Sequence, residues 1–139
     1  MDMDCLFCKL ANGIFDTNIV YEDENFTAIM DISPAAMGHV IVISKEHAKN
    51  IFELPAELVG EGHKVAQKIA KAIKEVTGCD GVNILQNNEK AAGQTVFHYH
   101  IHVIPRFEND DVKIKWTLND VSQDELKEMA KKLSVKCDK

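Results

Sequence analysis

Apolar and polar positions alternate or recur with two different periods along the chain, and these periods predict its elements. Residues 19–22 and 26–30 are short runs rich in β-branched and aromatic side chains, and three polar residues join them. That arrangement is typical of a β-hairpin. Residues 55 to about 77 instead carry an apolar side chain at every third or fourth position. This spacing predicts one long amphipathic helix with a charged outer face.

Further elements follow from the same patterns. Residues 38–44 and 81–86 are apolar segments that predict two more strands, and residues 3–12 predict a short helix that ends at Gly13. Ser122 precedes acidic residues and is expected to cap a terminal helix that runs to about residue 133.

Residues 94–105 form the most unusual segment, because His98, His100 and His102 alternate with apolar residues. In a β-strand, side chains two residues apart point to the same face, so the three imidazoles are expected in a row about 6 to 7 Å apart. The residues between them are expected to face the core. Together with the other segments, this strand predicts an α+β fold with a mainly antiparallel five-stranded sheet, one long helix and two short helices.

Composition narrows the class of protein without identifying its chemistry. The chain has 139 residues, 45% of them hydrophobic and 27% charged, which fits one globular domain with a core of its own. A net charge of −6 argues against a general nucleic-acid binder. We find neither a signal peptide nor a membrane span, and therefore expect a cytoplasmic protein whose four cysteines are metal ligands or free thiols.

The histidine row admits three readings on chemical grounds. Alternate histidines can bind a metal, one imidazole can act as a nucleophile while its neighbours assist, or the row can bind an anion without chemistry. The preceding segment, residues 93–96, offers backbone N–H groups, an amide and a hydroxyl of the kind that hold phosphate oxygens, which favours phosphorus chemistry. The separate pair Cys5 and Cys8 could be a redox pair, half of a zinc site or two buried small residues.

The segment from Gln94 to Ile104 resembles the signature of the histidine triad (HIT) family, in which three histidines alternate with apolar residues. Residues 31–34 and 38–42 match the family at the expected places, and Asn87 lies seven residues before Gln94. The chain is most similar to the small Hint-like and bacterial HIT hydrolases. The resemblance implies a HIT domain over residues 1–139, with a core at 5–107 and a C-terminal tail that contains the terminal helix.

The resemblance also implies roles for the histidines. His100 would attack the α-phosphorus of a nucleotide and form a nucleotidyl-histidine intermediate that water then hydrolyses. An unperturbed imidazole has a pKa of about 6.5 and is a competent nucleophile near neutral pH. His102 would contact the phosphate and help the leaving group depart, and His39 would orient the triad.

Substrate and metal contacts are implied in the same way. Asp31 would bind the ribose hydroxyls, and Asn87, Thr95 and the backbone of Gln94 to Val96 would hold the phosphate. The expected base pocket, each member of which could equally be plain core, consists of Phe7, Leu10, Ile29, Ile32 and Ile41. The expected ligands of a structural zinc ion are Cys5, Cys8, His47 and His98.

The implied function is hydrolysis of a nucleoside 5′-phosphoramidate or an aminoacyl adenylate by a homodimer, with release of a purine nucleoside monophosphate. In that dimer the long helix and an adjacent strand would pair across a two-fold axis. A dinucleoside polyphosphate hydrolase is the alternative within the family, and a nucleotide- or zinc-binding regulatory protein is the alternative outside it. Ser44 and the C-terminal tail depart from the family pattern, so the substrate is the least constrained part of this prediction.

Overall fold

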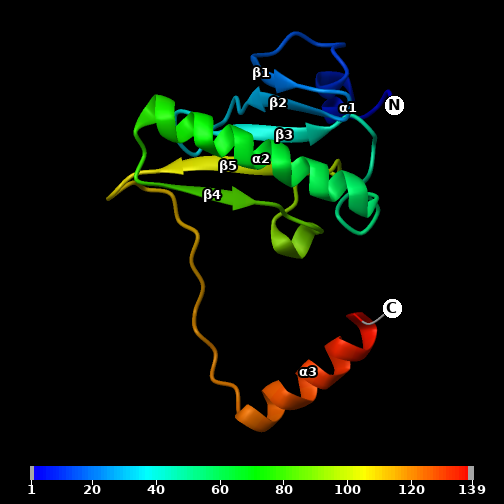
Figure 1. The fold of residues 1–139 in the computed structure, drawn as a ribbon, viewed down its shortest axis with the longest axis vertical. Coiled ribbons are helices and arrows are strands. Elements are labelled where there is room, and N and C mark those ends of the chain that lie inside the picture. Colours follow the sequence, from blue (N-terminus) through cyan, green and yellow to red (C-terminus); the bar gives the residue numbers. More distant parts are fainter. Residues whose placement is uncertain (1, 138–139) are drawn as a thin grey trace.

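A computed structural model describes residues 2–137, so the outermost residues of the predicted 1–139 domain lie outside the described part. Five strands form one antiparallel sheet (Figure 1). In sheet order they are β1 (Ile19–Glu22), β2 (Phe26–Met30), β3 (Val40–Ser44), β5 (His100–Arg106) and β4 (Gly81–Leu85). The predicted α+β fold is confirmed.

Helix α2 (Ala56–Thr77) covers one face of the sheet and encloses the larger part of the core (Figure 1). Its apolar stripe packs on residues of β2, β3 and β5, and Tyr99, Ile101 and Val103 are fully buried there, as predicted. Gly62 permits the close approach of α2, because a Cβ at this position would lie 2.9 Å from a ring carbon of Phe26. The helix ends at Gly78, which adopts the left-handed conformation typical of helix C-termini.

The opposite face of the sheet is covered by the short helix α1 (Leu6–Ala11), which packs on β2 and β3. Ile41 and Ile43 of β3 point to this face, and they pair in register with His102 and His100 of β5. Because side chains alternate across a sheet, β5 contributes apolar residues to the α2 face and imidazoles to the α1 face.

The strand that carries the histidines begins later than predicted. We expected a strand from residue 94, but β5 starts at His100. Residues 94–99 form an irregular connection that leads into the strand. The N–H of Tyr99 donates to the carbonyl of Ala48, 2.8 Å away, which ties this connection to the loop after β3. His98 therefore lies outside the strand, and the prediction that all three histidines share one strand is wrong.

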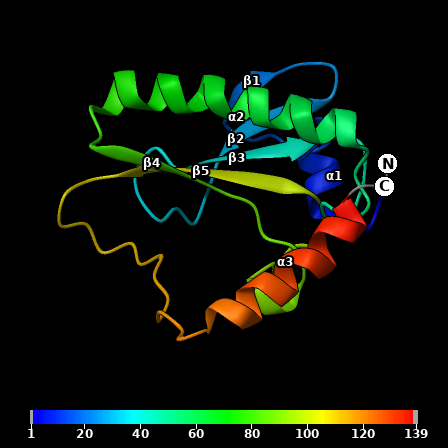
Figure 2. The same ribbon diagram turned by 60° about the horizontal axis from the view of Figure 1, so that its bottom comes forward.

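An extended arm follows β5 and ends in α3 (Gln123–Cys137), well separated from the sheet (Figures 1 and 2). Ser122 caps the helix as the sequence predicted, because its hydroxyl oxygen accepts from the N–H of Glu125, and its hydroxyl donates to the Glu125 carboxylate, each at 3.1 Å. The helix continues beyond the expected residue 133, since neither glycine nor proline interrupts it and Lys136 suits its C-terminal dipole. No described residue of α3 is buried.

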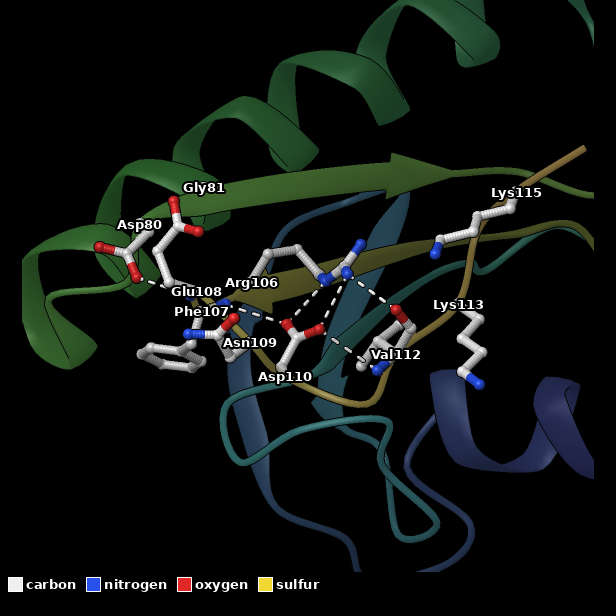
Figure 3. A pocket seen from close by; sticks show the side chains of 10 residues that line it. All are labelled: Asp80, Gly81, Arg106, Phe107, Glu108, Asn109, Asp110, Val112, Lys113 and Lys115. Atoms are coloured by element: carbon white, nitrogen blue, oxygen red, sulfur yellow. Dashed lines mark hydrogen bonds and ion pairs between the residues drawn. The ribbon is translucent and has the colours of Figure 1, made fainter.

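Arg106 fixes the point at which the arm leaves the sheet (Figure 3). Its guanidinium makes a two-fold contact with the carboxylate of Asp110, at 2.8 and 2.9 Å, and also donates to Asn83 and to the carbonyl of Val112. These bonds join the end of β5 to β4 and to the first residues of the arm. Among the described helices, none is both long and apolar enough to cross a membrane.

Candidate active site

A cavity of about 510 Å³ opens on the α1 face of the sheet, between α1, the end of β2 and the loop before β5. It brings together ten of the residues that the sequence nominated. They are Phe7, Leu10, Ile29, Asp31, Ile32, Ile41, Thr95, Val96, His100 and His102. The lining therefore combines apolar side chains with two imidazoles and a carboxylate.

His100 is held with one ring nitrogen free. Its Nδ1 lies 2.6 Å from the carbonyl oxygen of His98, and a carbonyl can only accept, so the proton resides on Nδ1. The edge of the Phe7 ring packs on the imidazole, with ring centroids 4.9 Å apart. Burial lowers the pKa of His100 below its ordinary value, so the ring is neutral near pH 7 and its Nε2 carries an available lone pair.

His102 and His39 form a hydrogen-bonded pair whose proton positions follow from the backbone. The N–H of Ala35 donates to Nδ1 of His39 at 3.0 Å, so neutral His39 must carry its proton on Nε2. Nε2 of His39 lies 2.9 Å from Nδ1 of His102 and donates a hydrogen bond to it. His102 consequently holds its own proton on Nε2. Burial, and then the neighbouring His100 and His39, lower its pKa to about 4.

Asp31 ends β2 at the polar side of the cavity. One carboxylate oxygen accepts from the N–H of Ser33 at 2.8 Å, and the other lies 3.4 Å from Nε2 of His39. The side chain is mostly buried but still lines the cavity. A carboxylate held in this way can accept hydrogen bonds from vicinal hydroxyls.

Two predicted substrate contacts do not reach the cavity. Gln94 is 3% exposed, and its side-chain amide bonds to the carbonyls of Lys49 and Val96 and to the N–H of Glu89. Asn87 lies beside Gly93, 3.6 Å from the position of a Cβ there, and is not among the lining residues. The Gln94 side chain bonds within the loop and that of Asn87 lies beside Gly93, whereas Gly93, Thr95 and Val96 line the cavity.

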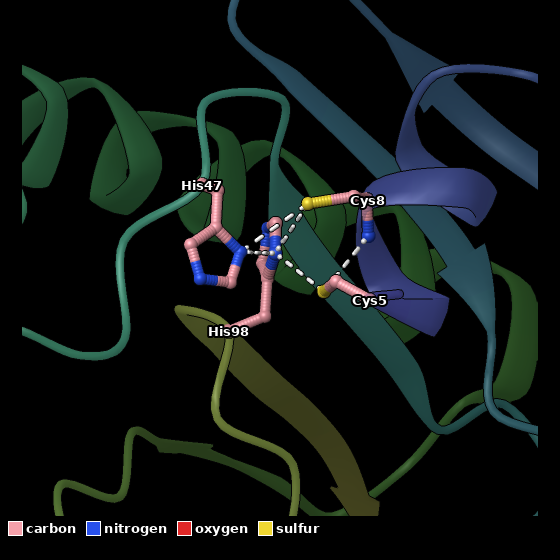
Figure 4. Close-up of side chains that lie close together, drawn as sticks. All are labelled: Cys5, Cys8, His47 and His98. Atoms are coloured by element: carbon pink, nitrogen blue, oxygen red, sulfur yellow. Dashed lines mark hydrogen bonds between the residues drawn. The ribbon is translucent and has the colours of Figure 1, made fainter. Parts of the chain in front are cut away.

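The four predicted metal ligands converge at the start of α1 (Figure 4). Nδ1 of His98 lies 3.3 Å from Sγ of Cys5 and 3.4 Å from Sγ of Cys8, and Nδ1 of His47 lies 3.3 Å from Sγ of Cys8. The two Nδ1 atoms are 3.2 Å apart. A tetrahedral zinc site requires about 3.3 Å between two nitrogens and about 3.6 Å between nitrogen and sulfur, so the donors fit a zinc ion.

Proton positions at these residues agree with metal binding. Nε2 of His98 lies 2.6 Å from the carbonyl oxygen of Ser44, so the proton is on Nε2 and the Nδ1 lone pair points at the thiols. The N–H of Cys8 donates to Sγ of Cys5 at the N-terminus of α1, which fixes the direction of this thiol. Burial raises the pKa of the Cys8 thiol, so a thiolate there needs a cation beside it.

Comparison with known proteins decides the family. The HIT domain model matches residues 12–109. The chain is 44% identical to the protein hit of Bacillus subtilis over 108 residues, which cover 78% of this chain and 74% of that protein. The chain belongs to the HIT family. It is also 34% identical to the adenosine 5′-monophosphoramidase of Saccharomyces cerevisiae, over 98% of this chain and 84% of that protein.

Solved HIT-like structures share the whole shape, including the arm. A protein from Streptococcus mutans superposes with a TM-score of 0.93 at 39% identity, covering 99% of this chain and 87% of the other. A zinc-bound histidine triad protein from Mycobacterium smegmatis is 38% identical, with a TM-score of 0.76 and coverage of 96% and 97%.

This HIT protein has a second hollow, of about 410 Å³, around Arg106 and Asp110 (Figure 3). The guanidinium and the carboxylate there are hydrogen-bonded to each other, so the hollow offers less free charge than its composition suggests.

The sequence did not predict the backbone groups of Ala35 and Ser44 that set the proton positions, or the cavity residues Asp16 and Thr17. A backbone partner leaves no mark in residue type, and nothing in the pattern distinguishes Asp16 from other polar loop residues.

Proposed function

We propose that this HIT protein hydrolyses nucleoside 5′-phosphoramidates or aminoacyl adenylates at the α-phosphorus through a nucleotidyl-His100 intermediate. The observation that carries the proposal is the 2.6 Å bond from Nδ1 of His100 to the carbonyl of His98. This bond holds the proton on Nδ1 and leaves the Nε2 lone pair of a cavity-lining imidazole free to attack. The similarity to a yeast adenosine 5′-monophosphoramidase supports the same class of reaction.

In the first step, Nε2 of His100 forms a bond to phosphorus while the bond from phosphorus to the leaving nitrogen breaks. The leaving nitrogen departs as an amine, with a proton supplied through Nε2 of His102. In the second step, water attacks phosphorus, the bond to His100 breaks, and the proton that water loses returns to His102. From a phosphoramidate the products are an amine and a nucleoside monophosphate. From an aminoacyl adenylate the bond from phosphorus to the carboxylate oxygen breaks instead, the carboxylate leaves without taking up a proton, and the products are an amino acid and a nucleoside monophosphate.

The charge of the cavity favours phosphoramidates over dinucleoside polyphosphates. Among the described lining residues there is neither lysine nor arginine, whereas Asp16 and Asp31 both contribute carboxylates. Several phosphates in a row would need cationic partners. A single phosphate with an amine or an α-amino group beside it does not, and the carboxylates favour a cationic leaving group.

The remaining parts of the cavity suit a purine nucleoside. Phe7, Ile41 and other apolar side chains of the lining would contact the base, and Asp31, which also lines the cavity, would accept from the ribose hydroxyls. Thr95 and Val96 line the cavity, and in this proposal they would hold the non-bridging phosphate oxygens through the Thr95 hydroxyl and their backbone N–H groups.

Replacement of the nucleophile tests the proposal. His100→Ala should lower the hydrolysis of adenosine phosphoramidate by about 10⁴-fold or more, because no other imidazole has its Nε2 free in the same place. AMP should still bind, and labelled nucleotide should be trapped on the wild-type protein only. His63→Ala, on the exposed face of α2, serves as the control. Normal turnover in His100→Ala would refute the mechanism, and binding without turnover in the wild type would indicate a regulatory nucleotide binder.

We further propose a homodimer in which α2 and the edge strand β4 meet their counterparts. β4 lies at the edge of the sheet with Ile84 44% exposed, and α3 exposes Leu126, Met129 and Leu133. Unpaired edges and exposed apolar stripes are usually covered in native assemblies. Light scattering should give about twice the mass of one chain, and Ile84→Lys should shift it towards a monomer. A monomeric wild type would contradict the dimer.

For the metal site we propose zinc bound by Cys5, Cys8, His47 and His98, which the distances described above support. A closed site with four protein ligands supplies cross-linking between α1 and the loops rather than a reactive water. Reduced thiols of this kind persist in the cytoplasm, which is the compartment we propose.

A further inference from the structure

Glu89 adopts a backbone conformation that is normally reserved for glycine. Its φ is 75° and its ψ is 160°, in a region where a Cβ is poorly tolerated. The residue immediately precedes the short 3₁₀ turn η1 (Lys90–Ala92), at the start of the segment that leads into the cavity. Such a conformation persists only where the surroundings hold it in place.

The Glu89 side chain is held by the loop that follows β3. Its carboxylate accepts from Nδ2 of Asn50 at 2.9 Å and lies 3.3 Å from Nζ of Lys49. Asn50 itself is 1% exposed, and its amide oxygen accepts from the N–H of Phe52, so its orientation is fixed. Hydrogen bonds from Asn50 and then Lys49 lower the pKa of Glu89, which is therefore anionic at neutral pH.

The Glu89 backbone is hydrogen-bonded to Gln94 through both its N–H and its carbonyl. Its N–H donates to Oε1 of Gln94 at 2.8 Å, and its carbonyl accepts from the N–H groups of Ala92 and Gln94, each at 3.1 Å. The buried amide of Gln94 donates in turn to the carbonyls of Lys49 at 2.6 Å and Val96 at 3.1 Å. A continuous network thus runs from the loop after β3 to the segment 93–96 that lines the cavity.

We infer that Glu89 is a positioning residue, whose carboxylate, latched by Asn50 and Lys49, holds the segment 93–96 in place to receive the phosphate beside His100. The inference rests on the proposed function for the identity of the substrate. The carboxylate is distant in sequence from the imidazoles and touches neither them nor the cavity.

The contacts of the carboxylate with Asn50 and Lys49 explain why position 89 is a glutamate and not a glycine. A glycine could adopt the same backbone angles without strain, but it would leave the Nδ2 donor of buried Asn50 without the carboxylate. The segment would then be joined to the loop after β3 only through Gln94, which bonds to Lys49 and Asn50, and through the bond from Ile51 to Asn88. Small errors in the direction of backbone N–H groups weaken their bonds to a phosphate.

The test compares Glu89→Ala, Glu89→Gly and Glu89→Gln in the full chain. We would measure the affinity of each for AMP and for adenosine, which lacks the phosphate, together with kcat for adenosine phosphoramidate. Glu89→Ala and Glu89→Gly should both bind AMP about tenfold more weakly, bind adenosine unchanged and lose about tenfold in kcat. Glu89→Gln retains an acceptor for Asn50 and should lose only about threefold.

Two exposed residues provide controls, namely Lys90→Ala within the same loop and Glu24→Ala for the loss of a carboxylate elsewhere. If Glu89→Ala does not fold, Glu89→Gln and Lys49→Met, which keep the loop's side-chain volume, carry the test. Wild-type AMP affinity and kcat in Glu89→Gly would overturn the inference, and so would equal losses of AMP and adenosine binding. A wild type that distinguishes AMP from adenosine without hydrolysing the phosphoramidate would refute the proposed hydrolase, while the binding comparison would still decide the role of Glu89.

Discussion

Two clusters of possible metal ligands lie on the α1 face of the sheet, each with two histidines, and they are suited to different tasks. Cys5, Cys8, His47 and His98 form one, and Asp31, His39 and His102 form the other, each with its donor atoms within 4.8 Å of one another. By residue type and distance alone, both could hold a metal ion.

Backbone groups make the difference between the two clusters. In the first, the carbonyl of Ser44 accepts a hydrogen bond from Nε2–H of His98, so the lone pair on Nδ1 of His98 points towards the thiols. In the second, the N–H of Ala35 occupies the lone pair of His39, so a proton lies between His39 and His102 where a metal would have to sit. A carbonyl partner prepares an imidazole for a metal, whereas an N–H partner prepares it to donate a proton.

The largest expected effect comes from removing the thiols. Cys5→Ser with Cys8→Ser should abolish zinc binding and lower Tm by about 10 °C or more, because metal binding is coupled to folding. Turnover by the folded fraction should fall much less. Metal analysis and thermal unfolding check this, with Cys137→Ser, an exposed thiol outside the cluster, as control.

Stripping the metal with a chelator sharpens the same comparison. Activity that survives stripping places the metal outside the chemistry. Activity that is lost, and then restored by zinc without refolding, would show that the metal takes part in the reaction and that the structural role of His98 is wrong.

A somewhat smaller effect is expected from His39→Ala. The variant should retain its zinc but lose about a hundredfold in kcat on phosphoramidates, since His102 is no longer held with its proton on Nε2. A substrate whose leaving group needs no proton should be affected far less. Equal losses on both substrates would show that His39 only supports the structure.

The smallest effect concerns stability in acid. The pKa of His102 is about 4 in the folded protein, mainly through burial, and near 6.5 when the chain is unfolded. The unfolded state therefore binds the proton more readily, so this contribution to stability is complete above about pH 6.5 and is lost as the pH falls towards 4. Between pH 7.5 and 5, Tm should fall less in His102→Gln than in the wild type. His63→Ala should behave like the wild type, and an identical acid loss in His102→Gln would contradict the assignment.

Period and residue type were sufficient to predict the elements of the fold. The alternation in β5 and the helical stripe of α2 predicted which residues form the core, because burial of one face requires those periods. The family signature added the residues of the cavity and the metal ligands, and the structure brings both groups together.

The errors arose where tertiary contacts override the local pattern. The bond from Tyr99 to Ala48 holds the residues before His100 in an irregular connection, so His98 lies outside the strand that alternation predicted for it. Gln94 looked like a phosphate ligand because its amide is polar and precedes the histidines, yet its bonds are directed into the loop. Hydrogen bonds to backbone groups depend on the fold and cannot be read from the sequence.

In β5, alternate residues face the core and the active site, and this alternation restricts how the protein can evolve. One residue inserted or deleted within the strand would exchange the buried face with the imidazole face for every residue beyond it, destroying the core and the site together. Substitutions at single positions affect only one of the two. Descendants of this gene can therefore drift in the composition of the strand, but the distance from Tyr99 to Val103 is expected to stay fixed for as long as either the fold or the chemistry is under selection.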